Sequence, residues 1–234
     1  MNTVVVTGAT KGLGLAISRR LSEDGFRIVG IGRSRTSSFE DIPNASFIEF
    51  DLENTKDIQA LVKSIQQEHG QIFGLVNNAG IGLDGVLGTM HSSEIEKVIT
   101  VNLLAAITLT KYVSRRMLAY SEGRIINISS IIASTGFNGL SVYAASKAGL
   151  EGFTRSFSRE VGRQGICVNC VAPGYMETDM TSSLEGDKLE SVRRRAPLGL
   201  PRVEDAAGAI SYLLSVDGSC VSGTVITVDG GSTA

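Results

Sequence analysis

The sequence predicts an α/β fold: one doubly wound, parallel sheet of seven strands with helices on both faces. Two observations lead to this prediction. Short β-rich runs alternate with longer helical patterns along nearly all 234 residues. The runs are continuously apolar rather than alternating, which is typical of strands covered by helices on both sides. In open sheets of this kind the ligand binds beyond the carboxyl ends of the strands, so we expect the functional residues there.

The expected elements follow one another in a regular order. The strands TVVVTG, RIVGIG, SFIEFD, IFGLVNNAG, GRIINISS, GICVNCVAPG and TVITVDGG occupy residues 3–8, 27–32, 46–51, 72–80, 123–130, 165–174 and 224–231. Helical patterns are expected at 12–24, 55–69, across 92–120, at 142–163 and at 203–215, and a loop follows the second strand. Because no linker, repeat or low-complexity tract interrupts them, we expect a single domain over 1–234. Residues 176–201, with Pro197, Pro201 and mixed charge, are expected to form an excursion over the surface.

The amino-acid composition argues against several classes of function. Residues are 42% hydrophobic and 20% charged, with a formal net charge of -2, as in an ordinary globular protein. A nucleic-acid binder or a binder of anionic membranes normally has a basic excess, so we expect neither partner. No apolar run reaches the roughly 20 residues of a bilayer span, and MNTVVVTGAT lacks the pattern of a signal peptide. The cytoplasm is the expected location.

The three cysteines are expected to be core residues rather than metal ligands or disulfide partners. Their odd number favours a reducing compartment. Cys167 and Cys170 lie in one apolar strand, where positions i and i+3 face opposite sides, and the two histidines, His69 and His91, are expected on the surface. We therefore expect no metal site. Asn127 begins a glycosylation pattern, but it lies in an apolar strand, so that match is disregarded.

The stretch VVVTGATKGLG places three glycines between a strand and a helix. Gly8, Gly12 and Gly14 permit a tight turn, and free amides at a helix start attract phosphate. The alternative is a plain strand-to-helix turn; because the glycines directly follow the first strand, phosphate binding is favoured. NNAG, ending at Gly80, and PGYMET, from Pro173 to Thr178, end two further strands, and each is either a turn or a ligand-binding edge.

Tyr143 precedes Lys147 by four residues in the helical segment SVYAASKAGL, so the phenol and the ammonium share one helical face. Taken alone, the pair is most simply a Tyr at the edge of a core with a Lys extending past it. The functional alternative is acid-base chemistry. A phenol has an ordinary pKa of about 10, and a fixed ammonium nearby favours phenolate and lowers that pKa.

Taken together and in order, TGATKGLG, NNAG, Asn102 in VNL, Ser130 in NISS, YAASK and PGYMETDM resemble the short-chain dehydrogenase/reductase family, with its Rossmann-type fold, over essentially the whole chain. Within that family the sequence is most similar to the 3-oxoacyl-(acyl-carrier-protein) reductases of fatty acid biosynthesis. The resemblance implies that Tyr143 donates a proton to a substrate carbonyl, that Ser130 holds the carbonyl oxygen, and that Lys147 tunes the phenol and holds the nicotinamide ribose. Asn102 is similar to the family asparagine that supports a water chain reaching the lysine.

A cofactor site is expected along the same edge, and its residues are Gly8, Thr10, Lys11, Gly12, Leu13, Gly14, Arg33, Asp51, Leu52, Asn78, Ala79, Gly80, Tyr143, Lys147, Pro173, Gly174, Met176 and Thr178. NADPH is expected rather than NADH, because the second strand ends in Gly32-Arg33-Ser34. This stretch lacks the acidic side chain that, in NAD sites, accepts hydrogen bonds from the ribose hydroxyls. Arg33, helped by Lys11, is expected to pair with a 2′-phosphate, and Asp51 to meet the adenine amino group by family resemblance. The alternative for Arg33 is a solvated loop residue.

The expected activity is NADPH-dependent reduction of a 3-oxoacyl thioester. An oxidoreductase of free alcohols, sugars or steroid ketones remains an alternative, because the resemblance implies shared catalytic residues and places substrate binding and specificity in 176–201. A non-catalytic dinucleotide-binding regulator is the second alternative. The resemblance also implies a homotetramer or homodimer and an acyl carrier protein as partner. Carrier-specific relatives present arginines beside the active-site mouth, before the fifth and sixth strands, but this chain has Ser121, Glu122 and Gln164 there, with Arg163 adjacent. Arg193 to Arg195 are interpreted as a solvated helix face, or else as contacts to substrate phosphates.

Overall fold

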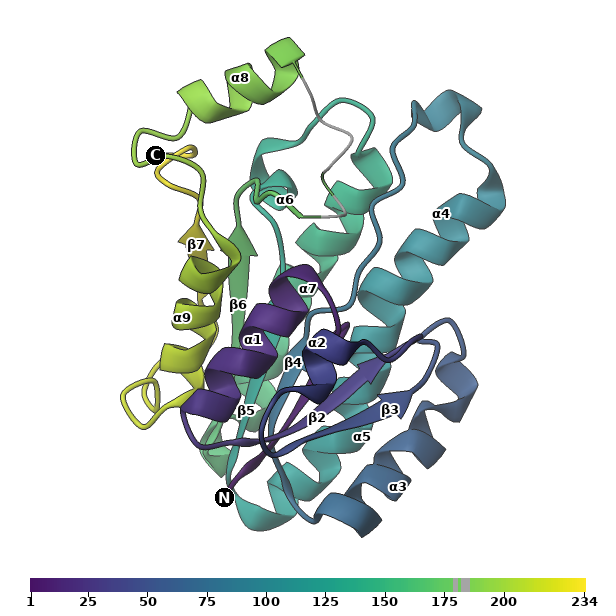
Figure 1. The fold of residues 1–234 in the computed structure, drawn as a ribbon. Coiled ribbons are helices and arrows are strands. Elements are labelled where there is room, and N and C mark those ends of the chain that lie inside the picture. Colours follow the sequence, from purple (N-terminus) through teal and green to yellow (C-terminus); the bar gives the residue numbers. More distant parts are fainter. Residues whose placement is uncertain (179–180, 182–185) are drawn as a thin grey trace.

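A parallel sheet forms the central layer of the protein (Figure 1). The computed structural model describes residues 1–178, 181 and 186–234. In that part of the chain seven strands pair in the order β3-β2-β1-β4-β5-β6-β7, and every pairing is parallel. They are β1 (Thr3–Thr7), β2 (Arg27–Gly32), β3 (Ala45–Glu49), β4 (Ile72–Asn77), β5 (Gly123–Ile128), β6 (Ile166–Pro173) and β7 (Val225–Val228). The predicted sheet is confirmed, and its order reverses at β1 and β4, where open sheets of this type bind ligands.

Helices cover both faces of the sheet, as predicted. One face carries α3 (Ile58–His69), α5 (Ala105–Tyr120) and α7 (Ser141–Val161), and the other carries α1 (Gly12–Glu23) and α9 (Val203–Leu214). Leu109 and Ile125 are buried in the first core, and Ile17 and Ile126 in the second. Residues 125 and 126 alternate between the two cores, so β5 is apolar on both sides. The strands β1, β4, β5 and β6 are buried along their whole length, whereas the edge strands β3 and β7 are partly exposed.

Several short elements were not predicted. They are α2 (Ser37–Glu40) in the expected loop, the π-helical turn η3 (Thr100–Leu104), α6 (Ile132–Thr135) and α8 (Gly186–Arg194). The helix α4 (Ser92–Ile99), which η3 joins to α5, belongs to the helices predicted across 92–120. Four-residue helices are too short to produce a readable period, and an irregular turn within 92–120 leaves the apolar pattern nearly continuous. The excursion predicted at 176–201 contains α8, while its residues 179–180 and 182–185 lie outside the described residues. None of the helices described is both long and apolar enough to cross a bilayer.

Candidate functional site

The turn between β1 and α1 depends on its glycines. Gly8 and Gly12 have φ angles of +64° and +48°, in the left-handed region that glycine adopts without strain. A Cβ atom on Gly14 would collide with the carbonyl oxygen of Gly8, so the missing side chain lets α1 begin directly against the end of β1. No acidic side chain lies in the first turn of α1 and no side chain caps it, as far as the chain is described. This cradle of backbone amides fits a phosphate group.

The two asparagines of NNAG connect the end of β4 to its neighbours. Asn78 Nδ2 donates to the carbonyl oxygens of Thr7 and Gly8, at 2.9 and 3.2 Å, which fixes the glycine turn. Asn77 Nδ2 donates to Asn127 Oδ1 of β5 at 2.8 Å and to Thr110 Oγ1 of α5 at 3.1 Å. Both asparagines therefore tie adjacent segments of the sheet edge together.

The other residues of the expected cofactor site follow the carboxyl ends of several strands. Arg33 and Lys11 are exposed, after β2 and at the start of α1 respectively. The backbone N–H of Glu53 donates to the carboxylate of Asp51, which follows β3, and the Leu52 side chain lies in the core with 7% of its surface exposed.

The loop after β6 continues the same edge of the sheet. Gly174 donates its N–H to the carbonyl oxygen of Val228 at 2.8 Å, which fixes the start of this loop. The Thr178 methyl group lies 3.5 Å from the position that a Cβ atom on Gly12 would occupy. The loop after β6 therefore lies against the glycine turn.

Tyr143, Lys147 and Ser130 meet where β5 and α7 adjoin. Tyr143 and Lys147 lie one turn apart near the start of α7, and Lys147 Nζ is 5.7 Å from the centroid of the phenol ring. Lys147 is 3% exposed, and its Nζ donates to the carbonyl oxygen of Ile128 at 2.7 Å. A hydrogen bond joins the hydroxyls of Ser130 and Tyr143. The three predicted side chains thus lie together, and the simple alternative of an exposed lysine extending past a core tyrosine is wrong.

Burial dominates the electrostatics of this group. Burial raises the pKa of the Tyr143 hydroxyl above its ordinary value, although the hydrogen bond to Ser130 acts to lower it. Burial also lowers the pKa of Lys147 to about 8. The net shift of the Tyr143 pKa is therefore opposite to the expected one, because desolvation of the phenolate is its largest cause.

Asn102 lies in the π-helical turn η3, a feature often found at functional sites. Its Oδ1 accepts the N–H of Ile81 at 2.8 Å, while its Nδ2 donates to the Ile81 carbonyl oxygen at 3.0 Å and to Ser146 Oγ at 3.1 Å. A Cβ atom on Gly80 would lie 3.3 Å from Lys147 Nζ and 3.4 Å from Asn102 Oδ1. Asn102 therefore holds the loop after NNAG against α7, beside Lys147.

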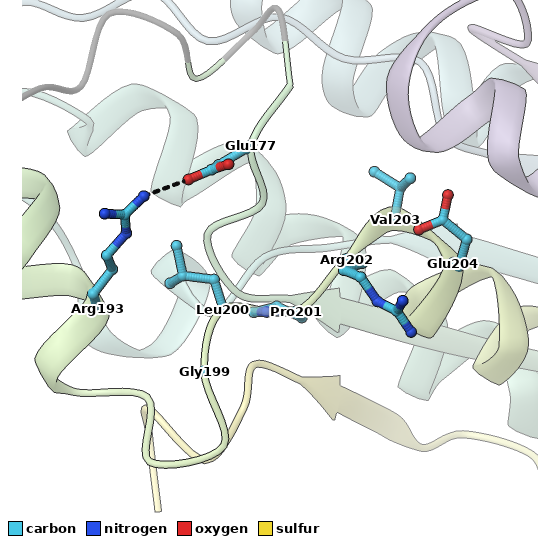
Figure 2. A pocket seen from close by; sticks show the side chains of 8 residues that line it. All are labelled: Glu177, Arg193, Gly199, Leu200, Pro201, Arg202, Val203 and Glu204. Carbon is cyan, nitrogen blue, oxygen red and sulfur yellow. Dashed lines mark hydrogen bonds and ion pairs between the residues drawn. The ribbon is translucent and has the colours of Figure 1, made fainter.

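A cavity of about 570 Å³ lies next to the excursion rather than at Tyr143. Figure 2 shows its lining residues, which are Glu177, Arg193, Gly199, Leu200, Pro201, Arg202, Val203 and Glu204. Arg193 is half-exposed and pairs with Glu177 at 2.8 Å and with Glu190 at 3.1 Å. Because Glu177 adjoins Thr178, this pair connects α8 to the loop beside the glycine turn. Arg194 and Arg195 are exposed, in agreement with a solvated helix face.

The positions expected to face a carrier protein do not border the active site of the same chain. Ser121 and Glu122 precede β5 and Gln164 precedes β6, so they lie at the amino edge of the sheet, whereas Ser130 follows the carboxyl end of β5. Six residues of β5 separate the two edges, a distance of roughly 20 Å. The expectation that these positions lie beside the mouth is wrong within one chain. The two loops are neighbours, since a Cβ atom on Gly165 would lie 2.6 Å from the Ser121 carbonyl oxygen.

The cysteines and histidines do not come together at one site. Cys167 Sγ contacts the carbonyl oxygen of Ser219 at 3.2 Å, whereas Cys170 Sγ lies 3.1 Å from Thr154 Oγ1 of α7, so the two side chains point to opposite faces of β6 as predicted. Among the described residues no cluster of three or more His, Cys, Asp or Glu side chains is suited to a metal. His69 is not on the surface as expected: its side chain is only 9% exposed. Cys220, expected in the core, is exposed.

Two polar pairs between β5 and α7 were missed by the sequence analysis. Asn127 Nδ2 donates to Thr154 Oγ1 at 2.8 Å, and Ser129 Oγ donates to Glu151 Oε1 at 2.8 Å. Asn127 is fully buried, which also explains why its glycosylation pattern has no meaning here. Glu151 follows Lys147 by four residues on α7, and that spacing was the available indication that a carboxylate lies below the lysine.

Comparison with known proteins identifies the group to which this arrangement belongs. Residues 2–189 match the short chain dehydrogenase family. The chain is 37% identical to the 3-oxoacyl-[acyl-carrier-protein] reductase of Vibrio cholerae, over 97% of this chain and 95% of the relative. Proteins of the same name from Escherichia coli and Pseudomonas aeruginosa are 36% and 38% identical over the same shares. The chain therefore belongs to the short-chain dehydrogenase family, as an oxidoreductase that uses a nicotinamide dinucleotide.

Proposed function

We propose that this protein reduces 3-oxoacyl thioesters to 3-hydroxyacyl thioesters with NADPH. The observation that carries the proposal is the meeting of Ser130, Tyr143, Lys147 and Asn102 at one end of α7, next to the glycine turn. The names of the relatives in Vibrio, Escherichia and Pseudomonas support the substrate class.

In the proposed reaction the nicotinamide, when bound, supplies a hydride to the carbonyl carbon. Ser130 donates a hydrogen bond to the carbonyl oxygen and so aligns the substrate. Tyr143 gives its hydroxyl proton to that oxygen as the negative charge develops, and the product is the alcohol. Lys147 holds the nicotinamide ribose hydroxyls and stabilises the phenolate left behind. Asn102 fixes the Ile81 backbone beside Lys147, which keeps open the route by which water returns the proton.

The preference for NADPH is proposed from the residues after β2. Gly32-Arg33-Ser34 offers no acid to accept ribose hydroxyls, and the exposed guanidinium of Arg33 suits a 2′-phosphate. Lys11, also exposed, adds positive charge beside the phosphate cradle. We propose that Asp51 meets the adenine amino group. The remaining residues of the expected cofactor site are proposed to line the same edge.

For the physiological setting, we propose the cytoplasm, a homotetramer or homodimer, and a small or coenzyme-A-linked 3-oxoacyl substrate rather than mainly one carried by an acyl carrier protein. The last point is proposed because Ser121, Glu122 and Gln164 stand where carrier-specific relatives have arginines, although one exposed arginine, Arg163, adjoins Gln164.

The experiment follows the loss of reduced nicotinamide absorbance with a panel of acetoacetyl thioesters, free ketones, sugars and steroid ketones. Efficient reduction of the thioesters alone supports the proposal. Efficient reduction of a sugar or steroid ketone with poor use of every thioester would assign the protein to another substrate class of the same family. Binding of NADPH without reduction of any carbonyl compound would point to a regulatory protein.

A further inference from the structure

We propose that Glu151 is a positioning residue for the reaction: through Ser129, its carboxylate fixes the distance between Ser130 on the β5 side and Tyr143 on α7. This inference rests on the proposed roles of Ser130 and Tyr143. It assigns a task to a residue that does not touch the substrate.

The contacts of Ser129 carry the argument. Its backbone N–H donates to the Val171 carbonyl oxygen of β6 at 2.8 Å, so the main chain immediately before Ser130 is still held by the sheet. Its side chain points the other way, toward α7, where Oγ donates to Glu151 Oε1 at 2.8 Å and lies 3.4 Å from the Lys147 carbonyl oxygen. Ser129 is 2% exposed, so water does not replace these partners. One hydroxyl thus joins the strand that positions Ser130 to the helix that carries Tyr143.

The chemical nature of Glu151 supports a specific task. Its side chain is only 15% exposed, and a carboxylate in such surroundings costs free energy unless it is paired and hydrogen-bonded. Its other oxygen lies 3.6 Å from the half-exposed guanidinium of Arg155, a long contact. Filling the space between β5 and α7 needs only an apolar residue. A carboxylate adds a short, charge-assisted hydrogen bond with a defined direction, which an apolar contact lacks.

The neighbouring pair provides a matched control. Asn127 and Thr154 also join β5 to α7 by a 2.8 Å hydrogen bond, but Asn127 lies two residues farther from Ser130 along the strand, and Thr154 lies three residues beyond Glu151. Both pairs help hold the helix on the sheet. Only the Ser129 pair borders the reacting groups, so only its loss should alter their geometry.

The test compares Glu151→Ala, Ser129→Ala, Glu151→Gln and Thr154→Val. Because a displacement of about 1 Å costs up to 10²-fold in rate, we expect Glu151→Ala and Ser129→Ala each to lower kcat about 10- to 100-fold, with KM for NADPH unchanged. Glu151→Gln keeps an acceptor oxygen and should retain most of the turnover. Thr154→Val should lower Tm but not kcat. The double variant Ser129→Ala/Glu151→Ala should be no slower than either single variant.

A second readout needs no substrate. The protein is labelled with 13C-tyrosine, and the Cζ resonance of Tyr143 is assigned by its loss in Tyr143→Phe. The chemical shift of this resonance reports the hydrogen bonding of the phenol oxygen. We expect it to shift in Glu151→Ala and Ser129→Ala and to stay in place in Glu151→Gln and Thr154→Val. An unmoved resonance in Glu151→Ala, or a Gln variant as impaired as the Ala variant, would overturn the inference. Failure of the unmutated protein to reduce any carbonyl compound would overturn the proposed function instead, while the resonance would still decide the question for Glu151.

Discussion

Replacing Lys147 by Met is expected to make the cofactor-free protein more stable near neutral pH while abolishing its turnover. Burial lowers the pKa of this lysine from 10.5 to about 8. Each pKa unit corresponds to about 1.4 kcal/mol, so keeping the ammonium protonated in the folded protein at pH 7 costs about 3 kcal/mol. Methionine has a similar length and no charge. It also leaves the Ile128 carbonyl oxygen without the 2.7 Å bond from Nζ, a loss of about 1 kcal/mol. The expected net gain at pH 7 is about 2 kcal/mol.

The pH dependence separates this explanation from a simple packing effect. Below pH 8 the lysine is protonated in both the folded and the unfolded protein, so the penalty is present in full. Between pH 8 and 10.5 the folded protein has released the proton and the unfolded chain still holds it, so the stability of the unmutated protein rises with pH through this group. The Met variant's higher free energy of unfolding should therefore approach that of the unmutated protein between pH 8 and 10.5. Above this range the Met variant should be the less stable protein by about 1 kcal/mol, because only the effect of the lost hydrogen bond remains.

Urea unfolding of both proteins at pH 7, 9 and 10 measures the difference directly, and Lys63→Met, at an exposed position on α3, serves as the control. The control should change stability little and without dependence on pH. A Lys147→Met protein that is less stable than the unmutated protein at pH 7, or whose advantage is the same at every pH, would refute the reasoning.

Three further outcomes are expected. Tyr143→Phe removes the proton donor but keeps the ring, so turnover should fall roughly 10²- to 10⁴-fold while NADPH affinity, measured by fluorescence titration, stays nearly unchanged; unaltered turnover contradicts the mechanism. Arg33→Asp should reverse or abolish the preference for NADPH, as kcat/KM with the two cofactors will show, and equal efficiency with NADH in the unmutated protein would count against the assignment. The third experiment compares kcat/KM for the same acyl chain on coenzyme A and on an acyl carrier protein. We expect the value to be lower with the protein carrier and to depend only weakly on salt concentration. Efficient, strongly salt-sensitive use of the protein carrier would show that Gln164 and Ser121 do not limit docking.

The sequence was sufficient for the sheet and for the edge at which the motifs meet, because both depend on local patterns. Apolar β-rich runs indicate strands, and a strand that ends in glycines or in NNAG places those residues at a carboxyl end wherever the strand lies in the sheet. The spacing of Tyr143 and Lys147 is equally local, since four residues on one helix share a face.

What could not be predicted depends on contacts between distant segments. The packing of α7 on β5 decides whether the Glu151 side chain faces solvent or Ser129. The helical pattern of the surrounding sequence is compatible with either orientation. The direction of the Tyr143 pKa was also missed, because it depends on how far each group is desolvated and not on sequence separation. The position of Ser121 and Gln164 was within reach of the sequence, because a residue that precedes a strand lies at the amino edge, whereas the ligand binds beyond the carboxyl edge.

The order of the strands determines which part of the proposed site is lost first when the protein unfolds locally. β5 is flanked by β4 and β6, and β5 and β6 are buried throughout, so amide hydrogens around Ser130 and the adjoining face of α7 should exchange only in the rarest, most global openings. β3 is an edge strand with partial exposure, and Asp51 follows it, while Arg33 follows its neighbour β2. Fraying from that edge should release the residues proposed to recognise the adenosine half of the cofactor at mild denaturant concentrations. Selectivity for the 2′-phosphate would then disappear while the catalytic side chains are still held in place.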